Sequence, residues 1–233
     1  MVSPTAELAL GGGLRKSSST KPKLVQDLVC KARAAQSVFE TFSQKQIDAI
    51  VRDFGKYVYD NAERVAAAAH EETGLGVYED KVAKAKSKAR VIWNNLKGKK
   101  SRGIIGEDEA AGLIFVAKPM GVVAAVCPVT NPIVTPMCNA MFALKAGNAV
   151  IFAPHPKAEA ATRDLTRAYR EILMRHKAPE DLVQMVRVCR DNAGSYEGGR
   201  CRGRDGWRRD GEICLFVGQA IVRCRRWKRS GGD

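Results

Sequence analysis

One carboxamide stands where it could do chemistry. Asn131 lies between Thr130 and Pro132, in the loop that follows the apolar run 121–126. An amide N–H at the end of a buried strand can donate a hydrogen bond into a cleft and stabilise negative charge on a substrate oxygen. The same side chain could instead form an Asx turn before Pro132, which is a structural role. The local residues leave both interpretations open.

Two proline-containing loops follow apolar runs, at the positions where a nucleotide would be expected in an α/β protein. Neither loop contains G-x-G-x-x-G, and the chain has no P-loop motif. The loops either form an unusual nucleotide site or hold prolines that simply end each strand. The candidate binding residues are Pro128, Val129, Thr130, Ala153, Pro154, His155 and Pro156.

The segments around these loops alternate between strand and helix patterns. The apolar runs at 121–126 and 149–152 are typical of buried parallel strands, and 182–186 is expected to form a third strand. Between them, 132–146 and 157–177 have helical periodicity. The order β-α-β-α-β predicts a doubly wound parallel sheet, with ligands at the carboxyl ends of the strands.

Helices are expected before this sheet. Apolar spacing predicts helices over 23–42, 61–73 and 78–96, and Ser43 begins a capping box that opens a further helix. A short β run is expected at 112–118. The Lys- and Arg-rich face over 81–97 is interpreted as a solvated helix surface.

The composition narrows the classes of protein to which the chain can belong. The 233 residues carry a formal net charge of +14, and 45% are apolar, which excludes a wholly disordered chain. We expect no membrane span, because no run of 18 apolar residues occurs, and no secretory signal. Seven cysteines, an odd number, fit a reducing cytoplasm better than a disulfide scaffold, so we expect a cytoplasmic protein.

Residue usage divides the chain into four parts: a flexible leader (1–21), a helical segment (22–98), part of a nucleotide-binding domain (99–186) and a tail (187–233). The tail holds 11 Arg, 1 Lys and 9 of the 21 Gly. It could bind nucleic-acid phosphates, or it could be translated out of frame. The spacing of its cysteines lacks any C-x-x-C pair, so no metal site is predicted. Those cysteines are Cys189, Cys201, Cys214 and Cys224.

Four motifs in order resemble the CoA-acylating branch of the aldehyde dehydrogenase superfamily. They are EETGLGVYEDK (71–81), PMGVVAAV (119–126), PVTNP (128–132) and IFAPHP (151–156). The resemblance covers about residues 23–186. It implies N-terminal helices followed by the first half of a Rossmann-like NAD(P)-binding domain, which is an α/β fold.

The resemblance also implies a reaction and its residues. A cysteine thiolate would attack a small aldehyde, hydride would pass to NAD or NADP, and coenzyme A would take the acyl group. Asn131 matches the asparagine that holds the aldehyde oxygen, and 153–156 looks like the loop on the adenosine side of the cofactor. The parent family forms homo-oligomers. Which aldehyde is used stays open.

No cysteine of the chain matches the family's nucleophile. Cys127 and Cys138 are interpreted as small core residues, and Cys30 likewise as structural. Synonymous codons for 201–233, chosen freely and read one nucleotide later, can encode the strand, glycine turn and helix that the family should show next. We therefore expect a frameshift near Arg187 and an inactive chain. The alternative is a non-catalytic protein that binds nucleic acid or a partner through its basic tail.

Overall fold

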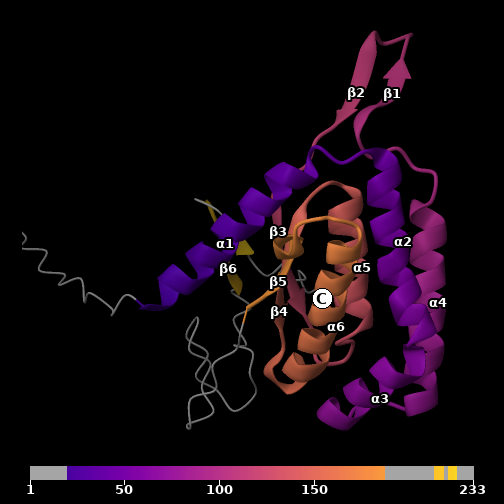
Figure 1. Cartoon of the computed structure of the whole chain (residues 1–233), viewed down its shortest axis with the longest axis vertical. Helices are drawn as coiled ribbons and strands as arrows, with labels where there is room; N and C mark the ends of the chain where they lie inside the picture. The colour runs from indigo at the N-terminus through magenta and orange to yellow at the C-terminus, as the bar shows by residue number, and fades with distance from the viewer. Residues whose placement is uncertain (1–19, 187–212, 218–219, 225–233) are drawn as a thin grey trace, which may run out of the picture.

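Four helices precede the sheet in the structure, a computed structural model that describes residues 20–186, 213–217 and 220–224. The expected helices are all present, with boundaries shifted by a few residues (Figure 1). They are α1 (Thr20–Phe39), α2 (Gln44–Asp60), α3 (Ala62–Thr73) and α4 (Tyr78–Leu96). Residues 1–19 of the expected leader lie outside the described residues, while 20 and 21 belong to α1.

Local capping explains two of the helix ends. Ser43 accepts a hydrogen bond from the Gln46 backbone N–H, and the Gln46 side chain accepts one from the Ser43 backbone, so the predicted capping box at the start of α2 is confirmed. Helix α3 ends at Gly74, whose φ of 64° places it in the left-handed region that glycine adopts without a steric cost.

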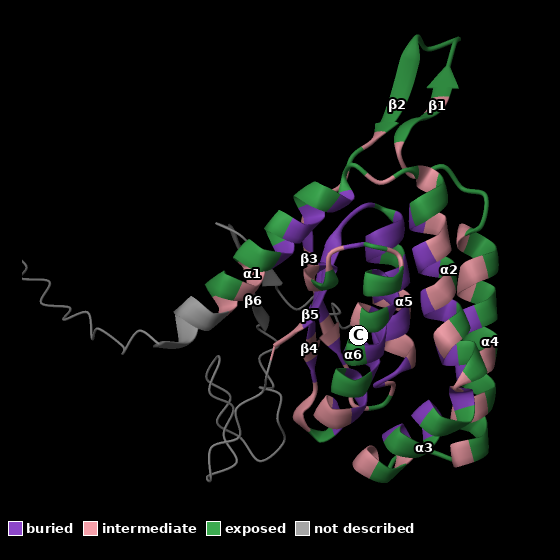
Figure 2. Ribbon diagram, in the orientation of Figure 1, coloured by how far each residue is buried: buried purple, intermediate pink, exposed green. Residues whose placement is uncertain are grey.

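A hairpin stands between the helices and the sheet. Strand β1 (Gly103–Asp108) pairs antiparallel with β2 (Leu113–Ala117), and an irregularity lies between Ile104 and Gly106. The sequence predicted β2 but missed β1, because GIIGED carries glycines and acidic residues that do not follow a strand pattern. The hairpin projects away from the other elements, and its surface is exposed (Figure 2).

A three-stranded parallel sheet forms the centre of the fold, as predicted. The strand order is β3-β4-β5, with register from Val122 opposite Ala149 to Cys127 opposite Pro154. The strands are β3 (Val122–Cys127), β4 (Ala149–Pro154) and β5 (Val183–Met185). Helices α5 (Val134–Lys145) and α6 (Glu159–Arg175) connect them, with 3-10 turns at Pro156–Ala158 and Glu180–Leu182.

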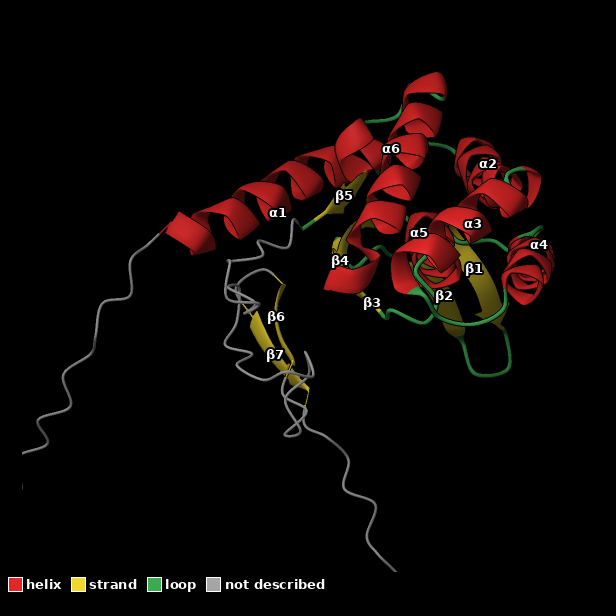
Figure 3. Ribbon diagram, turned by 90° about the horizontal axis from the view of Figure 1, so that it is seen from below, coloured by secondary structure: helices red, strands yellow, loops and turns green. Residues whose placement is uncertain are grey.

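The strands lie between two groups of helices. Helix α1 covers one face of the sheet, and α5 and α6 cover the other (Figure 3). Helices α2, α3 and α4 pack outside α5 and α6. The core between these layers includes a stacked aromatic pair, Phe54 and Tyr169, whose ring centroids are 4.0 Å apart. The helices and the parallel sheet therefore share one apolar core, to which the β1–β2 hairpin does not contribute.

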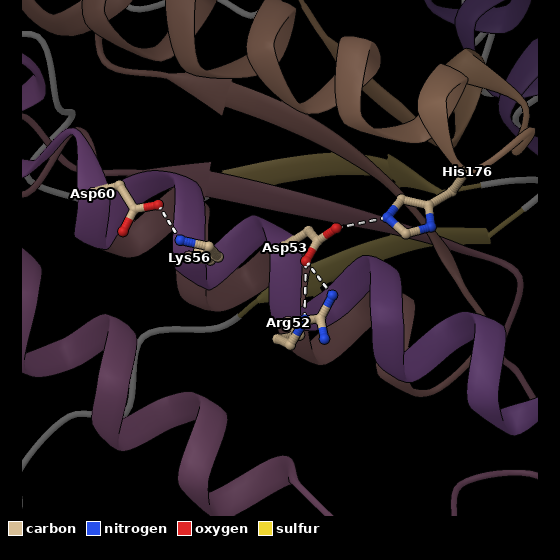
Figure 4. A network of polar contacts seen from close by, with 5 residues as sticks. All are labelled: Arg52, Asp53, Lys56, Asp60 and His176. Atoms are coloured by element: carbon tan, nitrogen blue, oxygen red, sulfur yellow. Dashed lines mark hydrogen bonds and ion pairs between the residues drawn. The ribbon is translucent and has the colours of Figure 1, made fainter.

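Polar contacts connect the outer helices to the sheet layer. His176 Nε2 lies 2.8 Å from Asp53 Oδ2 and so joins the end of α6 to α2, while Arg52 contacts the other oxygen of Asp53 (Figure 4). Lys145, buried on α5, pairs with Asp48 at 2.5 Å. These contacts fix α2 against both crossover helices.

Strands β6 (Ile213–Val217) and β7 (Ala220–Cys224) form a separate antiparallel pair. Along the described residues, none of the helices has the length and apolar character that crossing a bilayer requires.

Candidate functional site

The two predicted loops meet at the carboxyl edge of the sheet. Cys127 and Pro154, the last residues of β3 and β4, are register partners. The backbone N–H of His155 then donates to the carbonyl of Cys127 at 3.1 Å, which continues the pairing past the strand ends. The candidate cofactor-binding segments 128–130 and 153–156 are thus neighbours, because parallel strands bring their carboxyl ends to one edge.

Asn131 lies just beyond this edge, half-buried, and does not form the Asx turn that its sequence allows. Its Oδ1 accepts a hydrogen bond from Lys84 Nζ at 3.2 Å, and its Nδ2 donates to Thr130 Oγ1 at 3.3 Å. An ammonium group only donates, so the amide atom facing Lys84 is the oxygen. One N–H of the carboxamide is used by Thr130, and the second is available to a ligand.

A shallow pocket brings three segments to Asn131. Apolar side chains of α3 and α4 line one part of it, and the segment that starts α5 lines another. Lys81 and Lys84 of α4 also line it. The lining residues are Val65, Ala66, Ala69, Lys81, Lys84, Ala85, Thr130, Asn131, Pro132, Ile133 and Val134.

The basic face of α4 is only in part the solvated surface that the sequence suggested. Exposed Lys84 follows that expectation, and half-buried Lys86 pairs with Glu63 of α3 at 3.0 Å. Lys84 also lines the pocket, together with half-buried Lys81. The spacing of Lys81, Lys84 and the buried Ala85 on one helix face was the available signal, but helical periodicity alone does not show what that face contacts.

Glu72 is a site residue that sequence reasoning missed. Its two carboxylate oxygens accept hydrogen bonds from the backbone N–H groups of Ala160 and Ala161, both at 2.8 Å. These donors belong to the first turn of α6, so Glu72 of α3 caps the helix that follows the second loop. A helix N-terminus often binds phosphate, but here a carboxylate of the chain already occupies it.

His155 occupies the turn between β4 and α6. Its Nδ1 accepts a hydrogen bond from the Lys157 backbone N–H at 3.1 Å, which caps the short 3-10 turn. Burial, and then the positive charge of Lys157, lower the pKa of His155 below its ordinary value. The imidazole is therefore mainly neutral at pH 7 and adds no positive charge to the loop.

Cys127 and Cys138 are poorly suited to act as nucleophiles. Cys127 is buried, and burial raises the pKa of its thiol to about 12. Burial also raises the pKa of Cys138, against the smaller effects of Lys88 and a backbone hydrogen bond. Both fit the core role that the sequence suggested. Cys30 does not, because it is exposed on α1.

No group of three or more His, Cys, Asp or Glu side chains with the geometry of metal ligands occurs within 20–186, 213–217 and 220–224.

Comparison with known proteins decides the family. Residues 9–196 match the sequence model of the aldehyde dehydrogenase family. The chain belongs to the aldehyde dehydrogenase family. The match begins within the expected leader and extends ten residues past the expected end of the domain.

Two curated relatives are similar to most of this chain. A succinate-semialdehyde dehydrogenase (acetylating) of Clostridium kluyveri is 51% identical over 162 residues, which are 70% of this chain and 36% of that protein. A sulfoacetaldehyde dehydrogenase of an Acholeplasma species is 43% identical over 165 residues, 70% and 34% respectively. The chain thus spans about a third of the length of these relatives.

Solved structures give the same result. An acetylating aldehyde dehydrogenase of Geobacillus thermoglucosidasius has a TM-score of 0.67 and 38% identity, over 70% of this chain and 36% of that one. A Rhodopseudomonas palustris propionaldehyde dehydrogenase with bound CoA and an acylated cysteine has a TM-score of 0.58 and 31% identity, over 69% and 36%. An engineered glycolyl-CoA reductase with bound NADP+ matches equally well over the same shares. The α/β fold with N-terminal helices is confirmed.

Parts of the sequence-based interpretation stay predictions. The four-part division of the chain and the roles of the loop residues are not tested by these findings. Residues 187–212 and 225–233, which carry most of the basic tail, lie outside the described residues.

Proposed function

We propose that residues 22–186 are the first part of a CoA-acylating aldehyde dehydrogenase that oxidises a small aldehyde with NAD or NADP. The observation that carries this proposal is the orientation and hydrogen bonding of the Asn131 carboxamide. Its carboxamide is oriented by Lys84 and keeps one free N–H at the carboxyl edge of the sheet.

Asn131 would act as an oxyanion donor. When a thiolate adds to an aldehyde, negative charge develops on the carbonyl oxygen, and a donor fixed in place stabilises that charge better than mobile water does. Lys84 positions the amide because it accepts no hydrogen bond and can face only Oδ1. The positive charge of Lys84 also polarises the amide and strengthens Nδ2–H as a donor.

The loop residues fit the adenosine side of a dinucleotide better than its phosphates. Pro128, Pro154 and Pro156 have no N–H to donate, and Glu72 occupies the N-terminus of α6. Half-buried Val129 and Ala153 offer apolar surface at the same edge. When bound, NAD or NADP would supply the hydride acceptor; this chain would hold the ring system and leave the phosphates to other groups.

The nucleophile would lie in sequence encoded beyond residue 186. Cys127 and Cys138 are held protonated by burial. We propose that 187–233 is translated out of frame, so that this chain has no turnover of its own and the repaired gene has. Coenzyme A would then be the co-substrate of the repaired enzyme.

We also propose that the enzyme is a homo-oligomer. The hairpin offers exposed apolar side chains that a second copy could cover, among them Ile114, Phe115 and Val116, which are 50–63% exposed. The two strands have no further partner strand among the described residues.

A cofactor titration tests the proposal on the full chain. We expect saturable binding of NADH by isothermal titration calorimetry, weakened at least severalfold in His155→Glu, which places a carboxylate at the loop. Asn94→Glu, an exposed change on α4 with the same added charge, should bind as the unmodified chain does. Absence of NADH binding, or equal binding by both variants, would contradict the assignment of the loop.

A further inference from the structure

The pocket beside Asn131 has an unusual composition for a small-aldehyde site. Its floor is apolar, from Val65, Ala66 and Ala69 of α3 and Ala85 of α4. Its other lining residues include Thr130, Asn131 and two lysines, Lys81 and Lys84, and the Lys84 ammonium group contacts Asn131. A site for a wholly apolar aldehyde would gain nothing from two positive charges at its wall.

The two lysines have no carboxylate to neutralise them. Within the part of the chain that the structure describes, neither Lys81 nor Lys84 has an acidic side chain at ion-pair distance. This sets them apart from Lys86, two residues on, which pairs with Glu63. Among residues that the structure describes, the one polar contact of the Lys84 side chain is the carboxamide of Asn131, a neutral group.

Lys81 and Lys84 are also close enough to affect each other. They are one helical turn apart on α4, and burial followed by the charge of Lys84 lowers the pKa of Lys81 below its ordinary value. The Lys81 side chain lies close to Gly76. A Cβ atom added to Gly76 would be 3.5 Å from Lys81 Cε and 3.9 Å from Lys81 Nζ. An anion between the two ammonium groups would relieve their repulsion.

We propose that Lys81 and Lys84 bind the negatively charged far end of the aldehyde, a carboxylate or sulfonate, while Asn131 holds its carbonyl oxygen. The inference rests on the proposed function, because it takes Asn131 as the oxyanion donor. It adds the substrate class: short aldehydes with an anionic end. Lys84 serves both parts of the site, since it orients Asn131 and supplies one of the two charges.

Stable amide analogues test this without turnover. Succinamate keeps the carboxylate and replaces the aldehyde by an amide; sulfoacetamide carries a sulfonate; butyramide has no charge. Each is titrated into the full isotope-labelled chain, and the NMR signals of the Asn131 side-chain amide, assigned by their loss in Asn131→Ala, report binding. We expect at least one charged probe to bind about tenfold more tightly than butyramide, and the tighter of the two identifies the anion.

Three variants, each of which removes one positive charge, show which lysines bind the anionic end of the probe. Lys81→Gln should weaken the charged probe about fivefold and leave butyramide unchanged, whereas Lys84→Gln should weaken the charged probe about fivefold or more and butyramide by a smaller factor. Lys84→Gln should also shift the Asn131 amide signals without ligand, because the carboxamide loses its orienting donor. Lys86→Gln, on the same helix with the same change in charge, should do neither. Equal affinity for charged and neutral probes, or equal losses in all three variants, would overturn the proposal.

A parallel titration with NADH separates the two proposals. If NADH binds but the probes are not distinguished, the anion site is wrong and the cofactor assignment stands. If the charged probes bind and respond to the lysine variants while NADH does not bind, the anion site stands and the dehydrogenase assignment for this chain fails.

Discussion

Removal of the Glu72 carboxylate should destabilise the fold at the helix that follows the second loop. Glu72 accepts two backbone hydrogen bonds at 2.8 Å from the first turn of α6, and it comes from α3, 88 residues earlier. In Glu72→Ala both N–H groups lose their partner, and the negative charge at the helix N-terminus is lost as well. Side-chain caps of this kind contribute about 0.5–2 kcal/mol, and charged acceptors lie at the upper end.

We therefore expect Glu72→Ala to lower the free energy of unfolding by about 2 kcal/mol, and Glu72→Gln, which keeps one acceptor oxygen, by about 1 kcal/mol. With a urea m-value of about 2 kcal/mol/M, the midpoint should fall by about 1 M in Glu72→Ala. Urea unfolding followed by far-ultraviolet circular dichroism measures it.

The neighbouring residue supplies the control. Glu71 is exposed, and its side chain makes no hydrogen bond among the described residues, so Glu71→Ala should change stability by less than about 0.5 kcal/mol. If Glu71→Ala and Glu72→Ala shifted the urea midpoint equally, the cap would contribute nothing and the reasoning would be refuted.

Three further predictions follow from the packing and the titrating groups. Burial raises the pKa of Asp53, but hydrogen bonds from His176 and Arg52 outweigh it, so the folded-state pKa lies below the ordinary value of about 4. The resulting stability is present above about pH 4 and is lost as pH falls through the folded pKa of Asp53. In thermal melts, Asp53→Asn should therefore reduce the fall in melting temperature below about pH 4. At pH 8, iodoacetamide should label Cys30 and leave Cys127 unmodified in the native chain, as peptide mass spectrometry would show. Phe54→Ala should cost about 3–5 kcal/mol in urea unfolding, because the ring is fully buried.

Each of these three predictions has a matched control variant or residue. Asp60→Asn removes an exposed pair with Lys56 and should leave the fall in melting temperature at acid pH unchanged. If Asp60→Asn and Asp53→Asn reduced that fall equally, the result would count against the Asp53 contact. Cys127 labelled as fast as Cys30 would show that β3 is not buried. Tyr59→Ala, at a 42% exposed ring on the same helix as Phe54, should cost far less; equal costs would show that the described core is not formed.

The sequence was most informative where one local rule decides the structure. The capping box at Ser43, the left-handed Gly74 and the apolar strands β3 and β4 are each read from a few neighbouring residues. It failed at β1, where glycines and acidic residues form part of a hairpin strand that is mostly exposed. It also failed at Cys30, because helical spacing did not show which side of α1 meets the sheet.

For the site, sequence order predicted the two loops but not their surroundings. Parallel strands bring Pro128 and Pro154 to the same edge by topology alone. The contacts of Glu72 and Lys84 join residues 88 and 47 positions apart, through the packing of α3 and α4 onto the α/β layer. No local pattern encodes such contacts, so the orientation of Asn131 needed the structure.

The central claim, that residues 22–186 are the first part of a CoA-acylating aldehyde dehydrogenase, is tested most directly on the gene. DNA sequencing from the codon for Leu182 through several hundred bases past that for Asp233 is the measurement. We predict that one base has been gained or lost near the codon for Arg187 and that the other reading frame continues into a cysteine-bearing catalytic domain. An intact frame with no dehydrogenase sequence after it would contradict the account. The Arg-rich tail would then be genuine, and salt-dependent binding of nucleic acid would be the property to measure.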